Sequence, residues 1–312
     1  MNDQSAPLPR TFADRLRAGL FLMTAEVAPP VSCDPRDLLR KATPLRGLAD
    51  AVNVTDGAGA RAHMGALAAA TILLGAGIEP ILQITCRDKN RIALQSELMG
   101  AAALGIRNVM VLTGDDPKAG DQPDTKPVFD IDSKTLIETA RQLRDEGTLP
   151  TGREVAGKAA FFLGAADMPI DPPPEWQPKA LLAKLAAGAE FVQTQFCMDA
   201  ALVRRYAGAL GQAGVTQKLA VLVGINPLRS AKSAQWMKSQ LFGTIIPDAL
   251  IARMEKAADP AREGIRICVD LIEELATIPG IAGVHIMAPG NDAAIPEVIA
   301  EARSRVQKAA AI

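Results

Sequence analysis

Two acidic side chains stand where an apolar strand gives way to a turn. Glu26 closes the run GLFLMTAEV, and two prolines follow shortly after it. Asp115 comes after the apolar run 109–112, a threonine and a glycine. A half-buried carboxyl group at the end of a strand can serve as a general acid, or it can accept a hydrogen bond from a neighbouring strand. The residues alone leave both interpretations of Glu26 open.

Asp115 and Asp116 are neighbours in sequence, but adjacent residues after a strand point in different directions. We therefore do not expect them to act as a pair. Gly114 would let the backbone approach a flat ligand beside Asp115 closely. Asp116 precedes Pro117 and is typical of a turn.

Two glutamines, Gln193 and Gln195, alternate with a threonine in the run FVQTQF. In a strand, residues two apart face the same way. Amides near a strand end could bind the donor–acceptor edge of a pterin or pyrimidine ring. They could equally form a polar layer inside the fold, and the sequence does not separate these interpretations.

Eight apolar runs alternate with segments of helical character, and this alternation predicts the elements that position these side chains. Strands are expected at 19–27, 51–56, 80–86, 109–112, 158–164, 191–196, 219–224 and 283–287. Helices are expected at 35–49, 61–75, 90–104, 133–147, 179–187 and 199–211, with two or three in 230–276 and one after Asn291. Asp34 or Ser32, and Asp132 or Ser133, are candidate helix N-caps, and Asn291 is the candidate cap of the last helix.

Strands that alternate with helices form a parallel sheet, and eight such units predict an α/β fold, the (β/α)8 TIM barrel. We expect a single domain over 1–312 with a short N-terminal helical leader; an open doubly wound sheet is the rival. Ligands bind at the carboxyl ends of barrel strands. The polar residues predicted there are Glu26, Thr55, Asp56, Gln83, Thr85, Arg87, Thr113, Asp115, Asp167, Gln193, Gln195 and Asn226.

The run Gly57–Ala62 matches the GxGxxA pattern of dinucleotide-binding turns. That pattern also needs an acidic residue at the end of the next strand, whereas Glu79 precedes its strand. A tight turn of small residues is the stronger interpretation, although the helix start expected there could meet an anion.

Composition excludes several classes of protein. The formal charge is −1, with one Tyr, two Trp and eight Phe, so neither the basic surface nor the aromatics of a nucleic-acid binder are present. The apolar run 62–78 is short for a membrane span.

Four scattered cysteines without a CxxC pair are typical of small core residues in a protein of the reducing cytosol. Two histidines in separate segments make a metal site a poor prediction. We expect a cytoplasmic protein that handles a small molecule.

Five segments occur in order along the chain: TAEVAPP, VNVTDGAG, LQITCRDKN, VMVLTGDDPKAGDQP…VFDIDS and FVQTQFCMD. Together they resemble the methylenetetrahydrofolate reductase family. The resemblance covers residues 22–199 closely and the remainder in outline. It implies a (β/α)8 barrel that binds FAD and interconverts 5,10-methylenetetrahydrofolate and 5-methyltetrahydrofolate in one-carbon metabolism and methionine biosynthesis. NADH or NADPH would be the electron donor, and a homo-oligomer is expected.

The resemblance also implies roles for individual residues. Glu26 resembles the family's general acid, and Asp115 the aspartate that binds the pterin beside the flavin. Gln195 resembles the glutamine that contacts the folate. The positions that resemble FAD contacts are Thr55, Gln83, Thr113, Gly114, Asp115 and Lys184.

Three positions depart from the well-known bacterial form of the family. Thr113 stands where that form has arginine, Asp56 where it has tyrosine, and Gln177 where it has aspartate. An alternative from another class is a non-redox pterin-binding barrel that acts in methyl transfer or as an accessory protein, and it would need no flavin.

Overall fold

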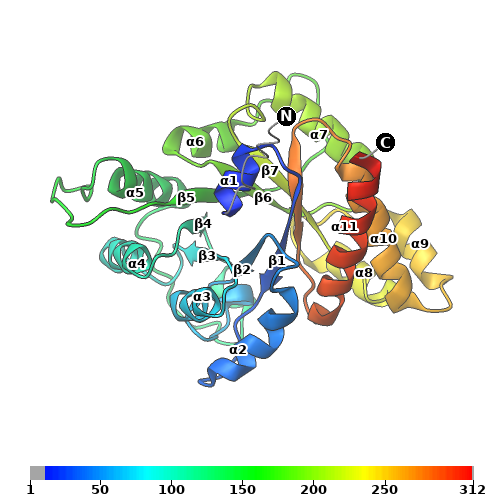
Figure 1. Ribbon diagram of the computed structural model, residues 1–312, viewed down its shortest axis with the longest axis horizontal. Coiled ribbons are helices and arrows are strands. Elements are labelled where there is room, and N and C mark those ends of the chain that lie inside the picture. The colour runs from blue at the N-terminus through cyan, green and yellow to red at the C-terminus, as the bar shows by residue number, and fades with distance from the viewer. Residues whose placement is uncertain (1–10, 311–312) are drawn as a thin grey trace, which may run out of the picture.

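The computed structural model describes residues 11–310, and its eight strands form one closed, parallel barrel in chain order (Figure 1). This confirms the (β/α)8 prediction and excludes the open sheet. The strands are β1 (Leu22–Val27), β2 (Ala51–Val54), β3 (Pro80–Thr85), β4 (Asn108–Leu112), β5 (Phe162–Asp167), β6 (Phe191–Phe196), β7 (Ala220–Ile225) and β8 (Ile281–Ile286).

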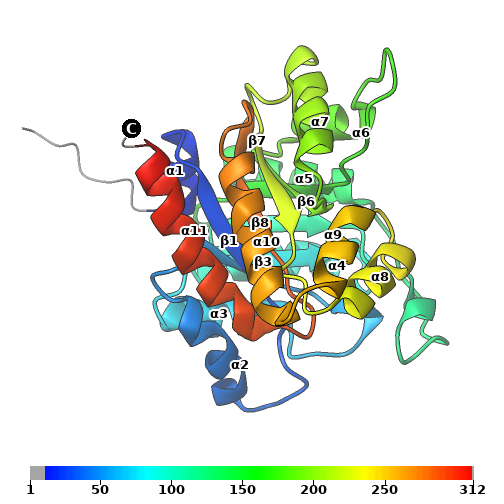
Figure 2. The same cartoon turned by 90° about the vertical axis from the view of Figure 1, so that its right-hand side faces the viewer.

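Helices surround the barrel, and α8 and α9 group beside α10 on one side (Figures 1 and 2). The helices are α1 (Phe12–Arg17), α2 (Pro35–Ala42), α3 (Ala66–Gly75), α4 (Arg91–Ala103), α5 (Ser133–Asp145), α6 (Lys179–Ala187), α7 (Ala200–Gln212), α8 (Ala231–Gln240), α9 (Asp248–Glu255), α10 (Pro260–Leu275) and α11 (Ile295–Ala310). Short 3₁₀ turns lie at Thr43–Leu45, Ala58–Ala60, Pro117–Ala119 and Asp292–Ala294. Within the described residues, no helix combines the length and the apolar character that a bilayer span requires.

Side-chain caps explain where several helices begin. Asp34, Asp132 and Asp199 each accept a backbone N–H from the first turn of their helix. Asn291 was predicted to cap the last helix, and this is wrong. Its side chain donates to the carbonyl of Pro227 instead, and a 3₁₀ turn precedes α11.

Two predicted elements are displaced along the chain. The fifth strand was expected at 158–164 but begins at Phe162, whose N–H donates to the Arg107 carbonyl. The second helix was expected at residue 61 but begins at Ala66. Gly57, Gly59 and the residue after Gly59 adopt left-handed backbone angles, which cannot continue into a helix. The GxGxxA run is therefore a turn, and the helix start that we expected within it lies further along the chain, at Ala66.

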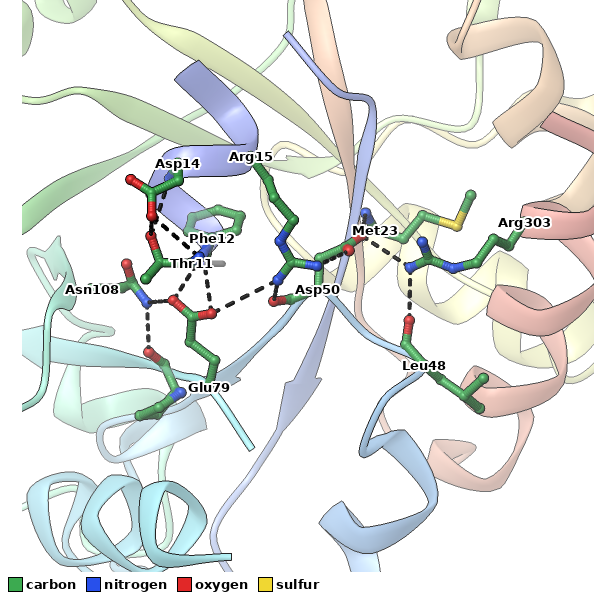
Figure 3. A network of polar contacts seen from close by, with 11 residues as sticks. Thr11, Phe12, Asp14, Arg15, Met23, Leu48, Asp50, Glu79, Asn108 and Arg303 are labelled. Atoms are coloured by element: carbon green, nitrogen blue, oxygen red, sulfur yellow. Dashed lines mark hydrogen bonds and ion pairs between the residues drawn. The ribbon is translucent and has the colours of Figure 1, made fainter. Parts of the chain in front are cut away.

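Helix α1 covers the amino-terminal end of the barrel, opposite the strand ends that carry the polar residues. Phe12 packs edge-on against the stacked rings of Phe162 and Phe191. Its backbone N–H donates to both carboxylate oxygens of Glu79, at 2.9 and 3.0 Å (Figure 3). Glu79 thus holds α1 at the amino-terminal end of the barrel. It is therefore not available as the acidic residue of a dinucleotide-binding turn at the opposite end.

Asp50 is the centre of the polar network at the same end of the barrel (Figure 3). Its side chain is 3% exposed and pairs with Arg15 of α1 at 2.6 Å and Arg303 of α11 at 3.1 Å. It also accepts the N–H of Met23 at 2.7 Å. One buried carboxylate therefore joins the first helix, the first strand and the last helix.

Candidate functional site

A cavity of about 580 Å³ opens at the carboxyl ends of the strands. The structure brings every predicted site residue to its wall: Glu26, Thr55, Gln83, Thr113, Gly114, Asp115, Lys184 and Gln195. Of the other polar residues predicted at the strand ends, Asp56, Thr85, Asp167 and Gln193 also line it, whereas Arg87 and Asn226 do not. Met110, Leu112, Met168 and Met287 add apolar surface. Such a cavity suits a flat, largely apolar ligand with polar edges.

Glu26 lies at the end of β1 with its side chain 22% exposed. Its Oε2 accepts a long hydrogen bond from the Gln83 amide at 3.4 Å and lies 3.6 Å from Nε2 of His285. Both of these contacts are made by Oε2, and Oε1 has no partner among the described residues. The carboxyl group is thus anchored through one oxygen and has the other available for a ligand.

Behind Glu26, four side chains form what we call the buried polar row: Asn53, Gln193, Thr24 and His285, each at most 2% exposed. The amides of Asn53 and Gln193 exchange two hydrogen bonds, at 2.5 and 3.0 Å. Gln193 also donates to Thr24 Oγ1 at 3.1 Å, and that hydroxyl lies 3.0 Å from Nδ1 of His285. Gln193 therefore belongs to an internal polar layer, which decides between the two interpretations of that residue.

The turn after β4 is built on glycine. Gly114 has φ +97°, and a Cβ there would approach Cβ of Arg87 to 2.8 Å and Cβ of Thr85 to 3.2 Å. Glycine is thus required because this turn packs on the neighbouring strand end, a different reason from the close ligand approach that we expected. Asp116 accepts the N–H of Lys118 and begins a 3₁₀ turn, as predicted.

Asp115 is exposed, and its Oδ2 accepts the N–H of Gly59 at 2.9 Å. The carboxylate therefore links the turn after β4 to the loop after β2. Asp56 makes a second link, because its Oδ2 accepts the N–H and hydroxyl of Thr85 and pairs with Lys89 at 2.9 Å. These two aspartates fix three neighbouring loops around the cavity.

Lys184 reaches the cavity from α6, so that helix borders the site. Its ammonium group donates to the carbonyl of Ala166 at 2.5 Å. Asp167, the last residue of β5, accepts the hydroxyl of Tyr206, and burial raises the pKa of Asp167 above its usual value. Tyr206 and Lys184 oppose that rise in pKa.

Gln195 is held at both ends of its amide. Its Oε1 accepts the N–H of Phe196 at 2.9 Å, and its Nε2 donates to the carbonyl of Phe242 at 3.2 Å. The second Nε2 hydrogen is not used by these bonds. The ladder between β6 and β7 is irregular at this point.

Thr55 supplies the test of whether a flat cofactor with polar groups at its edge fits. Its Oγ1 is buried and has no hydrogen-bond partner within the described part of the chain, although the residue lines the cavity. Buried hydroxyl groups rarely stay unpaired. A ligand with carbonyl or amide groups at the ring edge would satisfy it, so the wall suits a flavin ring.

Three residues of the site were missed as functional candidates: Thr24, Asn53 and His285. Each is a polar residue within an otherwise apolar strand. Thr24 is also two residues from Glu26, so the two share a face of β1. In a closed barrel such residues must point inward, and that signal was present in the sequence.

Comparison with known proteins gives one consistent result. A family model described as methylenetetrahydrofolate reductase matches residues 11–303. A protein of Caenorhabditis elegans named probable methylenetetrahydrofolate reductase (NADPH) is 26% identical over 239 residues, which is 74% of this chain and 33% of that protein. Methylenetetrahydrofolate reductase 2 of Schizosaccharomyces pombe is 24% identical over 208 residues, 64% of this chain and 31% of that protein. The chain thus spans about a third of the length of both relatives.

Solved structures agree on the architecture. An uncharacterized protein from Clostridium thermocellum that binds two copies of 5-methyl-5,6,7,8-tetrahydrofolic acid superposes with a TM-score of 0.64 at 13% identity, covering 95% of this chain and 98% of that one. DmoA from Hyphomicrobium sulfonivorans gives a TM-score of 0.54 at 12% identity, over 92% and 88% of the two chains. At these identities the likeness concerns the fold alone.

Proposed function

Because the chain belongs to the methylenetetrahydrofolate reductase family, we propose that it is a flavin-dependent oxidoreductase that interconverts 5,10-methylenetetrahydrofolate and 5-methyltetrahydrofolate. The observation that carries the proposal is the meeting of Glu26, Asp115 and Gln195 at one cavity. They come from β1, the turn after β4, and β6, which are distant in sequence. An acid, an acceptor for pterin N–H groups and an amide are the groups that this chemistry needs.

Glu26 is the general acid of the proposed reaction. Its carboxyl group gives a proton to a nitrogen of the imidazolidine ring, and the bond between that nitrogen and the methylene carbon breaks. The bonding electron pair stays on the nitrogen, which leaves an iminium group on the folate. Glu26 becomes a carboxylate and regains a proton from solvent through the open cavity.

FAD would be held by Thr55, Gln83, Thr113, Gly114, Asp115 and Lys184, and when bound it would supply the hydride that turns the iminium carbon into a methyl group. The unpaired hydroxyl of Thr55 supports this placement. Lys184 keeps two ammonium hydrogens beyond the one it gives to Ala166, so it can also bind an anionic group.

Asp115 and Gln195 hold the substrate in this proposal. Asp115 uses Oδ2 for Gly59, which leaves Oδ1 to accept N–H groups of the pterin. Gln195 has one free amide hydrogen for a folate carbonyl. The name of the Caenorhabditis elegans relative makes NADPH the first electron donor to test, with NADH second. A cytoplasmic location and a homo-oligomeric state stay predictions.

The amount of flavin that the protein binds distinguishes this proposal from a folate-binding barrel without redox chemistry. We expect purified protein supplied with FAD to show a flavin band near ~450 nm, and anaerobic 5-methyltetrahydrofolate to bleach it. Parallel stopped-flow traces with NADPH and NADH identify the donor. A protein that binds folate, retains no flavin and gains no activity with added FAD would overturn the proposal.

A further inference from the structure

The buried polar row has a defined direction of hydrogen bonding. Asn53 and Gln193 exchange two bonds, a pattern that would also form if both amides turned over together. The second Nδ2 hydrogen of Asn53 donates to the sulfur of Met110 at 3.5 Å, and this contact sets the orientation of both amides. This leaves the second Nε2 hydrogen of Gln193 for Thr24 Oγ1, which must accept it. Thr24 then has one hydrogen of its own to donate.

That hydrogen has two possible acceptors, Nδ1 of His285 at 3.0 Å and the carbonyl of Val284 at 3.2 Å. If it goes to Nδ1, His285 carries its own proton on Nε2, the nitrogen that lies 3.6 Å from Glu26. If it goes to Val284, Nδ1 carries the proton and Nε2 presents a lone pair to Glu26. An ionised carboxylate accepts hydrogen bonds and cannot donate one, so only the first arrangement stabilises Glu26 after it has lost its proton.

We propose that His285 is a positioning residue for Glu26, held by the buried polar row in the tautomer that carries its proton on Nε2. This inference rests on the proposed role of Glu26 as the acid. Gln83 and His285 then both donate to Oε2, which leaves Oε1 to carry the proton that the substrate receives. The contact of 3.6 Å is long, and such contacts shorten in the substrate complex.

The tautomer is measurable without any turnover. The chain has two histidines, His63 and His285, so ¹⁵N-histidine NMR gives two ring systems, and His63→Asn assigns them. We expect His285 to show a protonated Nε2 and an unprotonated Nδ1. Proton on Nδ1 in the free enzyme and in its folate complex would overturn the inference, whether or not the protein proves to be a flavoenzyme.

The variant Thr24→Val removes the hydroxyl with little change of shape, and Thr24→Ser is the matched control that keeps it. We expect Thr24→Val to slow the folate half-reaction about tenfold, less than the roughly 10²–10⁴-fold contribution of a general acid itself. The half-reaction with NADPH should keep its rate, and Thr24→Ser should recover the folate rate.

The separation of kcat from KM gives a readout that a purely structural role would not produce. Asp115 and Gln195, which hold the folate in the proposed function, are unchanged in Thr24→Val. The KM for the folate should therefore stay within about twofold while the rate of the folate half-reaction falls. An unchanged rate and tautomer in Thr24→Val would reject the positioning role while leaving the proposed function intact.

Discussion

At the scale of single residues, Glu26 shows how much a side chain depends on neighbours that the sequence places far away. A carboxylate at the end of an apolar strand was predictable from the run GLFLMTAEV. Its contacts with Gln83 and His285 come from β3 and from β8, which pairs with β1 only because the barrel closes. Those contacts could not be predicted from local pattern, because they depend on the register between strands.

Replacing Glu26 with glutamine tests the acid directly. We expect Glu26→Gln to reduce the folate half-reaction by about 10²–10⁴-fold, since an amide cannot deliver the proton. Flavin binding and reduction by NADPH should survive, because the substitution keeps size and polarity. Equal loss of both half-reactions would instead assign Glu26 a structural role.

The cysteines give a second prediction at this scale. All four were expected in the core, but Cys33 is exposed whereas Cys86, Cys197 and Cys268 are buried. Burial raises the pKa of Cys86 and of Cys197 to about 11. Thiolates are the reactive form, so a thiol reagent at pH 8 should label one cysteine per native chain and four after denaturation. Labelling of two or more native thiols would contradict this packing.

At the scale of elements, strand identity was predictable and strand limits were less so. Apolar runs bounded by turn residues located all eight strands. The fifth was placed about four residues early because Ala159–Phe161 is as apolar as the strand itself. What sets its register is tertiary packing, since Gly164 lies under the ring of Phe191. The site residues on strand ends were found because a parallel barrel gathers those ends, a rule that needs no coordinates.

Gly164 provides a test of that packing. A Cβ at this position would lie 2.2 Å from Cζ of Phe191, so Gly164→Ala should lower the free energy of unfolding by about 1–3 kcal/mol through overpacking. The control is Gly208→Ala within α7, where a Cβ meets nothing within 4 Å. That change should raise stability by roughly 0.5–1 kcal/mol. Urea unfolding of both variants measures the difference, and a neutral Gly164→Ala would contradict the register of β5.

At the scale of the whole molecule, the two ends of the barrel have separate tasks. The carboxyl end holds the cavity and its acid, amide and lysine groups. The amino-terminal end holds α1, the cluster of three phenylalanines and the network around Asp50. In barrels of this kind the carboxyl-terminal face generally carries the chemistry, and the amino-terminal face contributes to stability.

Asp50→Asn tests this separation. It removes the charge that faces Arg15 and Arg303 while keeping the side chain's shape. Breaking a buried pair is costly, so we expect the free energy of unfolding to fall by on the order of 3 kcal/mol. The kcat of folded protein should stay within about twofold, because the variant lies at the opposite end of the barrel. Calorimetry and steady-state assays on the same sample measure both, and loss of activity without loss of stability would contradict the separation.

The shared carboxylate of Asp50 also bears on the order of folding. Arg15 lies near the start of the described chain and Arg303 near its end, yet both pair with the same buried group. Until α11 has docked, Asp50 lacks one of its two cations, and until β8 pairs with β1 the barrel is open. Barrel closure and the full pairing of this charge therefore both depend on the carboxyl-terminal elements of the barrel, β8 and α11. During synthesis on the ribosome, we expect the amino-terminal strands to stay sensitive to proteolysis until α11 has emerged and docked.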